Sequence, residues 1–227
     1  VVCYAEDGST ALREFQMVNW PWKRETLNVR FMPRWASRLT LIVTDVRVHE
    51  AGPADCPAIY ELIVALAVYE KEPDAVEGSV GDLRTHLFGP APQVFCHVAE
   101  VRDESGRWSV AGIAIWYVTF STWKVRHGIW LEDLFVRPQA RGLGLGRLLL
   151  AELAAIALQR GYPRFEWWVL DWNTPAQGFY ESLGAIPQDE WTVWRTADAA
   201  LTALGSAAAG PMPSGTMPAR TTPTDLA

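Results

Sequence analysis

Three glycines, Gly142, Gly144 and Gly146, stand where an apolar strand is expected to pass into an aliphatic helix. The first amides of a helix have no internal hydrogen-bond partners and carry the positive end of the helix dipole. Glycines just ahead of these amides leave room for a phosphate group to reach them. We therefore expect the segment RGLGLGR to bind a pyrophosphate.

Several interpretations of this loop remain open from its residues alone. The first is a glycine-rich turn that binds nothing. A dinucleotide-binding fold uses G-x-G-x-x-G in its first strand–helix unit, whereas this loop reads G-x-G-x-G followed by Arg147 and comes later in the chain. A nucleoside-triphosphate loop ends in Gly-Lys-Ser/Thr, which is absent here. Coenzyme A is the fourth interpretation, and it depends on residues outside the loop.

Glu132 lies on an otherwise apolar strand, where an unpaired carboxylate would be costly if buried. A structural ion pair with Arg137 or Arg126 is one interpretation of this carboxylate. The next residue, Asp133, is expected on the opposite sheet face by strand alternation and is interpreted as structural.

Periodicity and turn residues predict a single α/β (α+β) domain, with one mixed central sheet flanked by helices. The adjacent pair Trp167 and Trp168 predicts packing into the core on both sheet faces, as in a buried central strand. The twelve tryptophans suggest an aromatic interior. The expected strands cover 44–50, 94–101, 108–120, 129–136, 165–170 and 191–196, and the expected helices cover 54–70, 80–88, 144–160 and 174–183.

Three regions are predicted along the chain. Residues 1–44 show no persistent period and are expected to be a poorly ordered or irregular extension. Residues 45–197 form the folded domain, of a common size. Residues 198–227 are rich in Ala, Pro, Gly and Thr, so a flexible tail is predicted.

Composition disfavours several classes of protein. The net charge of −6 disfavours non-specific binding to nucleic acid and suits a cationic small molecule better. Three scattered cysteines and four scattered histidines show no metal-ligand spacing, so no metal is expected. No apolar run is long enough to span a membrane, and no signal-peptide pattern opens the sequence, so a cytoplasmic protein is expected.

Two longer segments give the glycine loop its context. IWLEDLFVRPQARGLGLG (129–146) and WNTPAQGFYESLGA (172–185) resemble the GCN5-related N-acetyltransferase (GNAT) superfamily, and specifically its diamine (spermidine/spermine) N-acetyltransferase branch. The segment ALAVYEKE (65–72) is also similar to that branch. The resemblance covers about residues 46–196. It implies a GNAT-type fold, with a mixed, mostly antiparallel central sheet flanked by helices, and an acetyl-CoA-dependent N-acetyltransferase.

The resemblance implies positions for the acetyl-CoA co-substrate. The strand backbone at Leu134, Phe135 and Val136 would bind the pantetheine arm as an added strand does. The pattern N-x-x-A-x-x-x-Y at Asn173, Ala176 and Tyr180 matches the second coenzyme A element. The pyrophosphate would be held by Arg141, Gly142, Leu143, Gly144, Leu145, Gly146 and Arg147.

The resemblance also implies catalytic and acceptor-binding residues. Tyr180 matches the acid that protonates the departing thiolate, although a tyrosine on a helix more commonly packs into the core. Glu132 matches the residue that binds the amine and acts as base. The residues expected to contact the acceptor are Tyr69, Glu70, Glu132, Glu166, Trp167 and Trp168.

One segment departs from the branch and leaves the acceptor open. An acidic residue precedes the LED strand in diamine acetyltransferases, whereas this chain has Ser121 and Thr122 in TFSTWKVRHG. A diamine, a polyamine and a thialysine-like amine all remain candidate small-molecule substrates. A protein N-terminus, an antibiotic amine, or a non-catalytic acyl-CoA-binding role are the alternatives. The branch implies a homodimer.

Overall fold

The computed structural model describes residues 45–207. These residues fall into two compact units, which divide between Leu170 and Asp171, and each unit is described here by itself. The predicted extension 1–44 and the end of the predicted tail, 208–227, lie outside the described residues.

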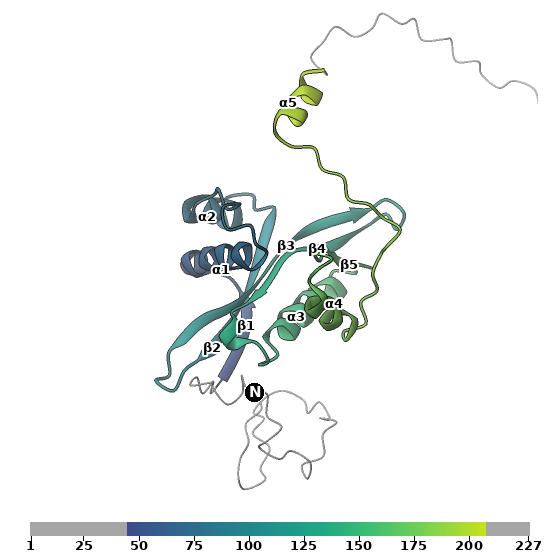
Figure 1. Cartoon of the computed structure of the whole chain (residues 1–227). Helices are drawn as coiled ribbons and strands as arrows, with labels where there is room; N and C mark the ends of the chain where they lie inside the picture. The colour runs from purple at the N-terminus through teal and green to yellow at the C-terminus, as the bar shows by residue number, and fades with distance from the viewer. Residues whose placement is uncertain (1–44, 208–227) are drawn as a thin grey trace, which may run out of the picture. The chain divides into compact units, whose positions relative to one another are not determined.

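The first unit is built on a five-stranded sheet with the order β1-β2-β3-β4-β5 (Figure 1). The first four strands are antiparallel to their neighbours, whereas β5 runs parallel to β4. The expectation of a mixed, mostly antiparallel sheet flanked by helices is confirmed. The strands are β1 (Asp45–Glu50), β2 (Val94–Arg102), β3 (Trp108–Ser121), β4 (Arg126–Val136) and β5 (Phe165–Trp167).

Helices α1 (Cys56–Tyr69) and α2 (Val80–Phe88) cover one face of the sheet (Figure 1). The buried residues of α1 recur every three or four positions, which gives the helix one apolar face. The side chain of Ser79 accepts a hydrogen bond from the Asp82 amide, a cap that begins α2. The core on this face includes Ile59, Leu62, Leu66, Leu87, Val98, Ile113, Ile115 and Phe135.

Helix α3 (Leu145–Gln159) packs on the opposite face of the sheet (Figure 1). Its buried residues also recur at helical spacing, and the helix ends before Gly161, whose φ of 67° favours glycine. The buried residues of α3 are Leu145, Leu149, Leu150, Leu153 and Ala157.

The second unit contains two short helices, α4 (Thr174–Glu181) and α5 (Asp198–Ala207). Pro175 stands in the first turn of α4, where its missing N–H costs nothing, and Gly184, with a φ of 86°, follows the helix. Helix α5 lies at the start of the predicted tail, 198–227. All residues of α5 are exposed, in keeping with a composition that offers little to bury.

Two strand predictions are wrong. The strand expected at 165–170 is confined to Phe165–Trp167 and lies at the sheet edge rather than at its centre. Residues 191–196 form no strand and are exposed, so the apolar alternation in WTVWRT does not mark a buried face.

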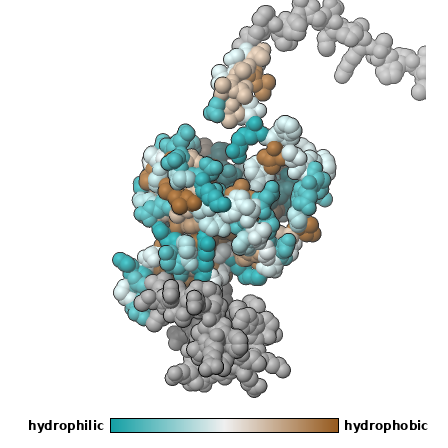
Figure 2. Space-filling view, viewed as in Figure 1, coloured by the Kyte–Doolittle hydropathy of each residue, from teal (hydrophilic) through white to brown (hydrophobic). Residues whose placement is uncertain are grey.

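The expected aromatic interior is also wrong for the described residues. Trp116 is the tryptophan buried in the core between 45 and 207, at 2% exposed. The core is aliphatic, because Leu, Ile and Val fill the spaces between the helices and the sheet. Trp123, Trp168 and Trp194 are well exposed. Figure 2 shows hydrophobic residues interspersed with hydrophilic ones on the face in view.

Within residues 45–207, no helix has the length and apolar character needed to cross a bilayer. The same part of the chain contains no group of three or more His, Cys, Asp or Glu side chains arranged to hold a metal ion.

Gly128 is required where β4 meets the segment that leads into β5. A Cβ atom at this position would lie 2.9 Å from the backbone oxygen of Arg164, which also accepts a hydrogen bond from the Ile129 amide. We expect Gly128→Ala to lower the free energy of unfolding by about 1–3 kcal/mol, the usual cost of overpacking. Urea denaturation followed by circular dichroism measures this change.

Gly81→Ala is the matched control, because a Cβ there meets the Ser79 Oγ at an ordinary 3.5 Å within α2. This variant is expected to be as stable as the wild type or slightly more stable. Equal stability of Gly128→Ala and the wild type would contradict the close approach.

Candidate active site

Strand β4 carries one extra residue at Glu132. In the pairing with β3, Asp133 lies opposite Ile115 and Leu131 lies opposite Trp116, so Glu132 has no partner and forms a β-bulge. Tyr117, two residues after Ile115 on the same face of β3, hydrogen-bonds to Glu132. Glu132 and Asp133 therefore share one face of the sheet, and the prediction that they point to opposite faces is wrong.

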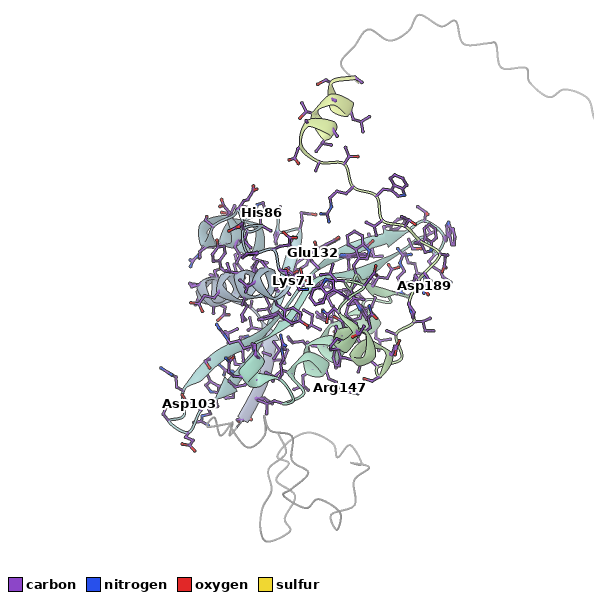
Figure 3. All side chains as sticks on the ribbon, in the orientation of Figure 1. Lys71, His86, Asp103, Glu132, Arg147 and Asp189 are labelled. Atoms are coloured by element: carbon purple, nitrogen blue, oxygen red, sulfur yellow. The ribbon has the colours of Figure 1, made fainter. Side chains whose placement is uncertain are left out.

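Two aromatic side chains hold the Glu132 carboxylate. The indole Nε1 of Trp130 donates a hydrogen bond of 3.0 Å to Oε2, and the Tyr117 hydroxyl bonds to the same side chain. Burial, together with the negative charge of Glu132 and this hydrogen bond, raises the pKa of Tyr117. Figure 3 labels Glu132 on the sheet.

The predicted alternative, a structural ion pair for Glu132, does not form. Arg137 instead pairs with Glu61, with 3.0 Å between Nη2 and Oε2. Arg126 has no ion pair with Glu132 in the described part of the chain. The carboxylate stays exposed and is held by neutral donors.

Asp133 lies within electrostatic reach of two further carboxylates, Glu132 and Glu70. Burial, reinforced by the negative charges of Glu132 and Glu70, raises the pKa of Asp133 to about 6. Burial also raises the pKa of Glu70, which caps the C-terminus of α1. Among residues 45–207, none of these three carboxylates forms an ion pair. We call Glu70, Glu132 and Asp133 the acidic cluster. No Lys, Arg or His side chain of residues 45–207 forms an ion pair with it.

Beyond the bulge, β4 has an open edge. β5 pairs with Ile129–Leu131 alone, so no described strand covers the same edge at 134–136. Leu134 and Val136 pair with β3 on the other side. The open edge offers backbone groups to an extended ligand, as an added strand would use them. This geometry suits the pantetheine arm of coenzyme A.

The glycine loop also suits a pyrophosphate. Gly142 and Gly144 have φ angles of 82° and 79°, a region that disfavours other residues. Gly144 is the N-cap of α3, and the following amides of Leu145, Gly146 and Arg147 lie at the open end of the helix. Figure 3 labels Arg147 there.

Arg141 joins the loop to β4 and α1. Its Nε donates a hydrogen bond of 3.1 Å to the Val136 carbonyl. Its guanidinium carbon lies 5.0 Å from the ring centroid of Tyr69 and 5.6 Å from that of Phe135. Cation–π attraction therefore connects the predicted cofactor loop with Tyr69, a predicted acceptor contact.

The predicted β5 residues divide between the two sheet faces. Glu166 lies opposite Trp130 in the parallel register and pairs with Arg164, and the Trp168 ring contacts Trp130. Trp167 lies opposite the buried Leu131, on the other face from Glu132. Glu166 and Trp168 thus share the face of Glu132, and Trp167 does not.

Tyr117 and Trp130 contact Glu132 but were absent from the predicted site. Their signal in the sequence is alternation, because Trp130 is two residues before Glu132. The register between β3 and β4, which no sequence pattern marks, pairs Tyr117 with Trp130 and so places Tyr117 beside the same carboxylate.

The second unit contains the remaining predicted residues. The Asn173 carbonyl accepts hydrogen bonds from the amides of Ala176 and Gln177 as α4 begins. The positions of Asn173, Ala176 and Tyr180 are three and four apart, which places them along one side of the helix. Tyr180 is half-buried, with its ring 5.4 Å from that of Phe179.

Comparisons with known proteins agree with this architecture. The model of the acetyltransferase (GNAT) family matches residues 58–185. A thialysine N-epsilon-acetyltransferase from Bos taurus is 40% identical over 152 residues, which cover 66% of this chain and 89% of that protein. A human spermidine/spermine N(1)-acetyltransferase-like protein 1 is 35% identical, over 66% of this chain and 22% of that protein.

Among solved structures, an integron cassette protein from the mobile metagenome of V. cholerae is 27% identical, with a TM-score of 0.58. The match covers 70% of this chain and 97% of that one. The family match and the relatives together show that the chain belongs to the GNAT acetyltransferase family, matches its diamine branch, and is an N-acetyltransferase.

Proposed function

We propose that this enzyme transfers an acetyl group from acetyl-CoA directly to a primary amine of a small cationic acceptor, with both substrates bound together. The acidic cluster carries this proposal, because three carboxylates without an ion pair in the described residues favour a cationic ligand. The cluster adjoins the open edge of β4, which suits the donor.

The acceptor must lose a proton before it reacts. A primary amine has a pKa near 10.4 and is an ammonium ion at neutral pH. Glu132 attracts this cation and accepts its proton, directly or through water. The hydrogen bonds from Trp130 and Tyr117 orient the carboxylate for that task.

Acetyl-CoA supplies an acetyl thioester, whose carbonyl carbon the neutral amine attacks, so that a C–N bond forms and the C–S bond breaks. The strand amides near Phe135 are the proposed donors to the carbonyl oxygen. Tyr180 is the proposed acid that protonates the departing thiolate. Arg141–Arg147 and Asn173 are the proposed contacts to coenzyme A. Simultaneous binding of both substrates removes much of the entropic barrier.

The β3–β4 hairpin favours a short acceptor over a long polyamine. Ser121 and Thr122 lie in the segment where the resemblance implies an acidic residue in diamine acetyltransferases. Ser121 is buried, and its Oγ accepts a hydrogen bond from the Lys124 amide. A hydroxyl used inside the turn does not anchor a distant ammonium. The thialysine acetyltransferase at 40% identity supports an amino-acid-like acceptor.

An acetyl-CoA turnover assay tests the proposal against a panel of thialysine, ornithine, putrescine, spermidine, an aminoglycoside and a peptide N-terminus. Release of free thiol is expected with thialysine at a higher kcat/KM than with spermidine. Binding of acetyl-CoA without thiol release for any amine would instead indicate an acyl-CoA-binding protein.

Glu132→Gln is expected to lower kcat/KM by about 10²–10⁴, the usual contribution of a general base. Steady-state rates between pH 6 and 10 measure this loss and the change in the pH profile. Glu61→Gln is the control, since Glu61 is exposed and pairs with Arg137. A Glu132→Gln enzyme with the wild-type rate and pH profile would remove Glu132 as the base.

The raised pKa of Asp133 predicts that its ionised carboxylate lowers the free energy of unfolding at neutral pH. The carboxyl titrates near 3.8 when unfolded and near 6 when folded, so the folded state holds the proton more tightly. The contribution of Asp133 to the free energy of unfolding is therefore greatest below about pH 4 and is lost as the pH rises through 6, by up to ~3 kcal/mol.

Asp133→Asn removes this titration. The variant is expected to be about 1–3 kcal/mol more stable than the wild type at pH 8, and the difference should shrink toward pH 4. Urea denaturation at both pH values measures it. A stability difference that does not depend on pH would contradict the assignment.

A further inference from the structure

Three aromatic rings form a corner beside Glu132. The ring centroids of Trp130 and Trp168 lie 4.9 Å apart, with their planes at 84°. Tyr117 stacks beside Trp130 at 6.4 Å and 30°, which extends one wall of the corner. Trp168 is 57% exposed, so the second wall is accessible to a ligand. We call these three side chains the aromatic corner.

The aromatic corner lies on the side of Glu132 away from the proposed donor-binding backbone of β4. Along β4, the proposed donor-binding backbone is at Leu134–Val136, Glu132 follows in the middle, and Trp130 lies beyond it. Two of the three aromatic side chains hydrogen-bond to Glu132. An acceptor with its nitrogen at Glu132 therefore extends away from the donor and over the aromatic corner.

Charges beyond the corner do not favour a second ammonium. On the same face of the sheet, the next paired positions are Thr119 with Gly128, then Ser121 with Arg126. The nearby carboxylate of Glu166 already pairs with Arg164. A second cation in this direction would meet a guanidinium and no unpaired carboxylate on β3 or β4.

We propose that Tyr117, Trp130 and Trp168 determine acceptor specificity, and select amines with one reactive ammonium and an apolar body, either a thioether or an aromatic ring, over diamines of the same length. This inference rests on the proposed function and narrows its acceptor class. A thialysine-like acceptor satisfies it, because the amino and carboxylate groups at its far end cancel in charge.

Cation–π attraction to the aromatic corner does not replace the missing carboxylate partner for the second ammonium of a diamine. Cation–π attraction at an exposed ring corresponds to about a twofold to fivefold gain in affinity. Two ring walls at right angles instead bury an apolar body on two sides, and apolar burial scales with the area covered.

Matched pairs of amines test the proposal. The wild type is expected to acetylate pentylamine with at least about tenfold higher kcat/KM than 1,5-diaminopentane, which differs by the second ammonium. It should likewise prefer 2-phenylethylamine to ethylamine. Trp168→Ala is expected to lower the ratio of kcat/KM for 2-phenylethylamine over ethylamine by about tenfold, mainly through KM.

Trp123→Ala is the matched control, since Trp123 is 84% exposed and lies outside the aromatic corner. It should keep the wild-type ratio. A preference for the diamine, or an equal ratio in Trp168→Ala and the wild type, would overturn the inference while leaving acetyl transfer intact.

Calorimetric titration separates this inference from the proposed function. 2-Phenylethylamine is expected to bind the wild type about tenfold more tightly than Trp168→Ala. If no amine is acetylated but this difference in binding remains, the proposed acetyl transfer is refuted, whereas the proposed binding of the acceptor at the aromatic corner is supported. If both variants bind equally, the aromatic corner is refuted whatever the turnover shows.

Discussion

The extra residue in β4, Glu132, determines which carboxylates lie on the sheet face that α1 and α2 cover. A regular strand would alternate Glu132 and Asp133 between the two faces, and α3 packs against the second. The bulge instead presents both carboxylates to the face shared with Tyr117 and Trp130. Burial, together with the negative charges of Glu132 and Glu70, raises the pKa of Asp133. The negative charge collected on this face favours a bound cation.

The same strand changes partners along its length, and this change separates the two proposed substrates. β3 pairs with β4 throughout, whereas β5 pairs with three residues and then ends. Beyond that point the backbone is open beside a helix N-terminus with two left-handed glycines. One strand therefore offers side chains to a cation at one end and main-chain groups to an extended ligand at the other.

Much of this fold is predictable from local patterns. Local patterns located α1, α2 and α3 closely, and the expected glycine turn precedes α3, with left-handed φ angles at Gly142 and Gly144. The motif around Glu132 also pointed to the correct strand. These features depend on residues near one another in sequence, where propensity and periodicity act directly.

The remaining features depend on contacts between distant segments. The bulge is a matter of register between β3 and β4, which the sequence of neither strand reveals. The bulge places Asp133 on an unexpected face, and the pairing of Tyr117 with Trp130 places Tyr117 in the site. Apolar runs such as 165–170 and 191–196 suggested buried strands, because hydrophobicity alone does not tell a covered surface from an exposed one.

The exposed tryptophans give the folded protein an unusual spectroscopic character. In most proteins, indole fluorescence reports unfolding, because the rings move from a dry interior into water. Here, within residues 45–207, Trp116 is the buried exception, and rings such as Trp168 and Trp123 already contact solvent. Emission from these exposed rings changes little on unfolding. A ligand that packs against an exposed ring such as Trp168 changes the solvent contact of that ring. Tryptophan emission is therefore expected to report ligand binding more than unfolding.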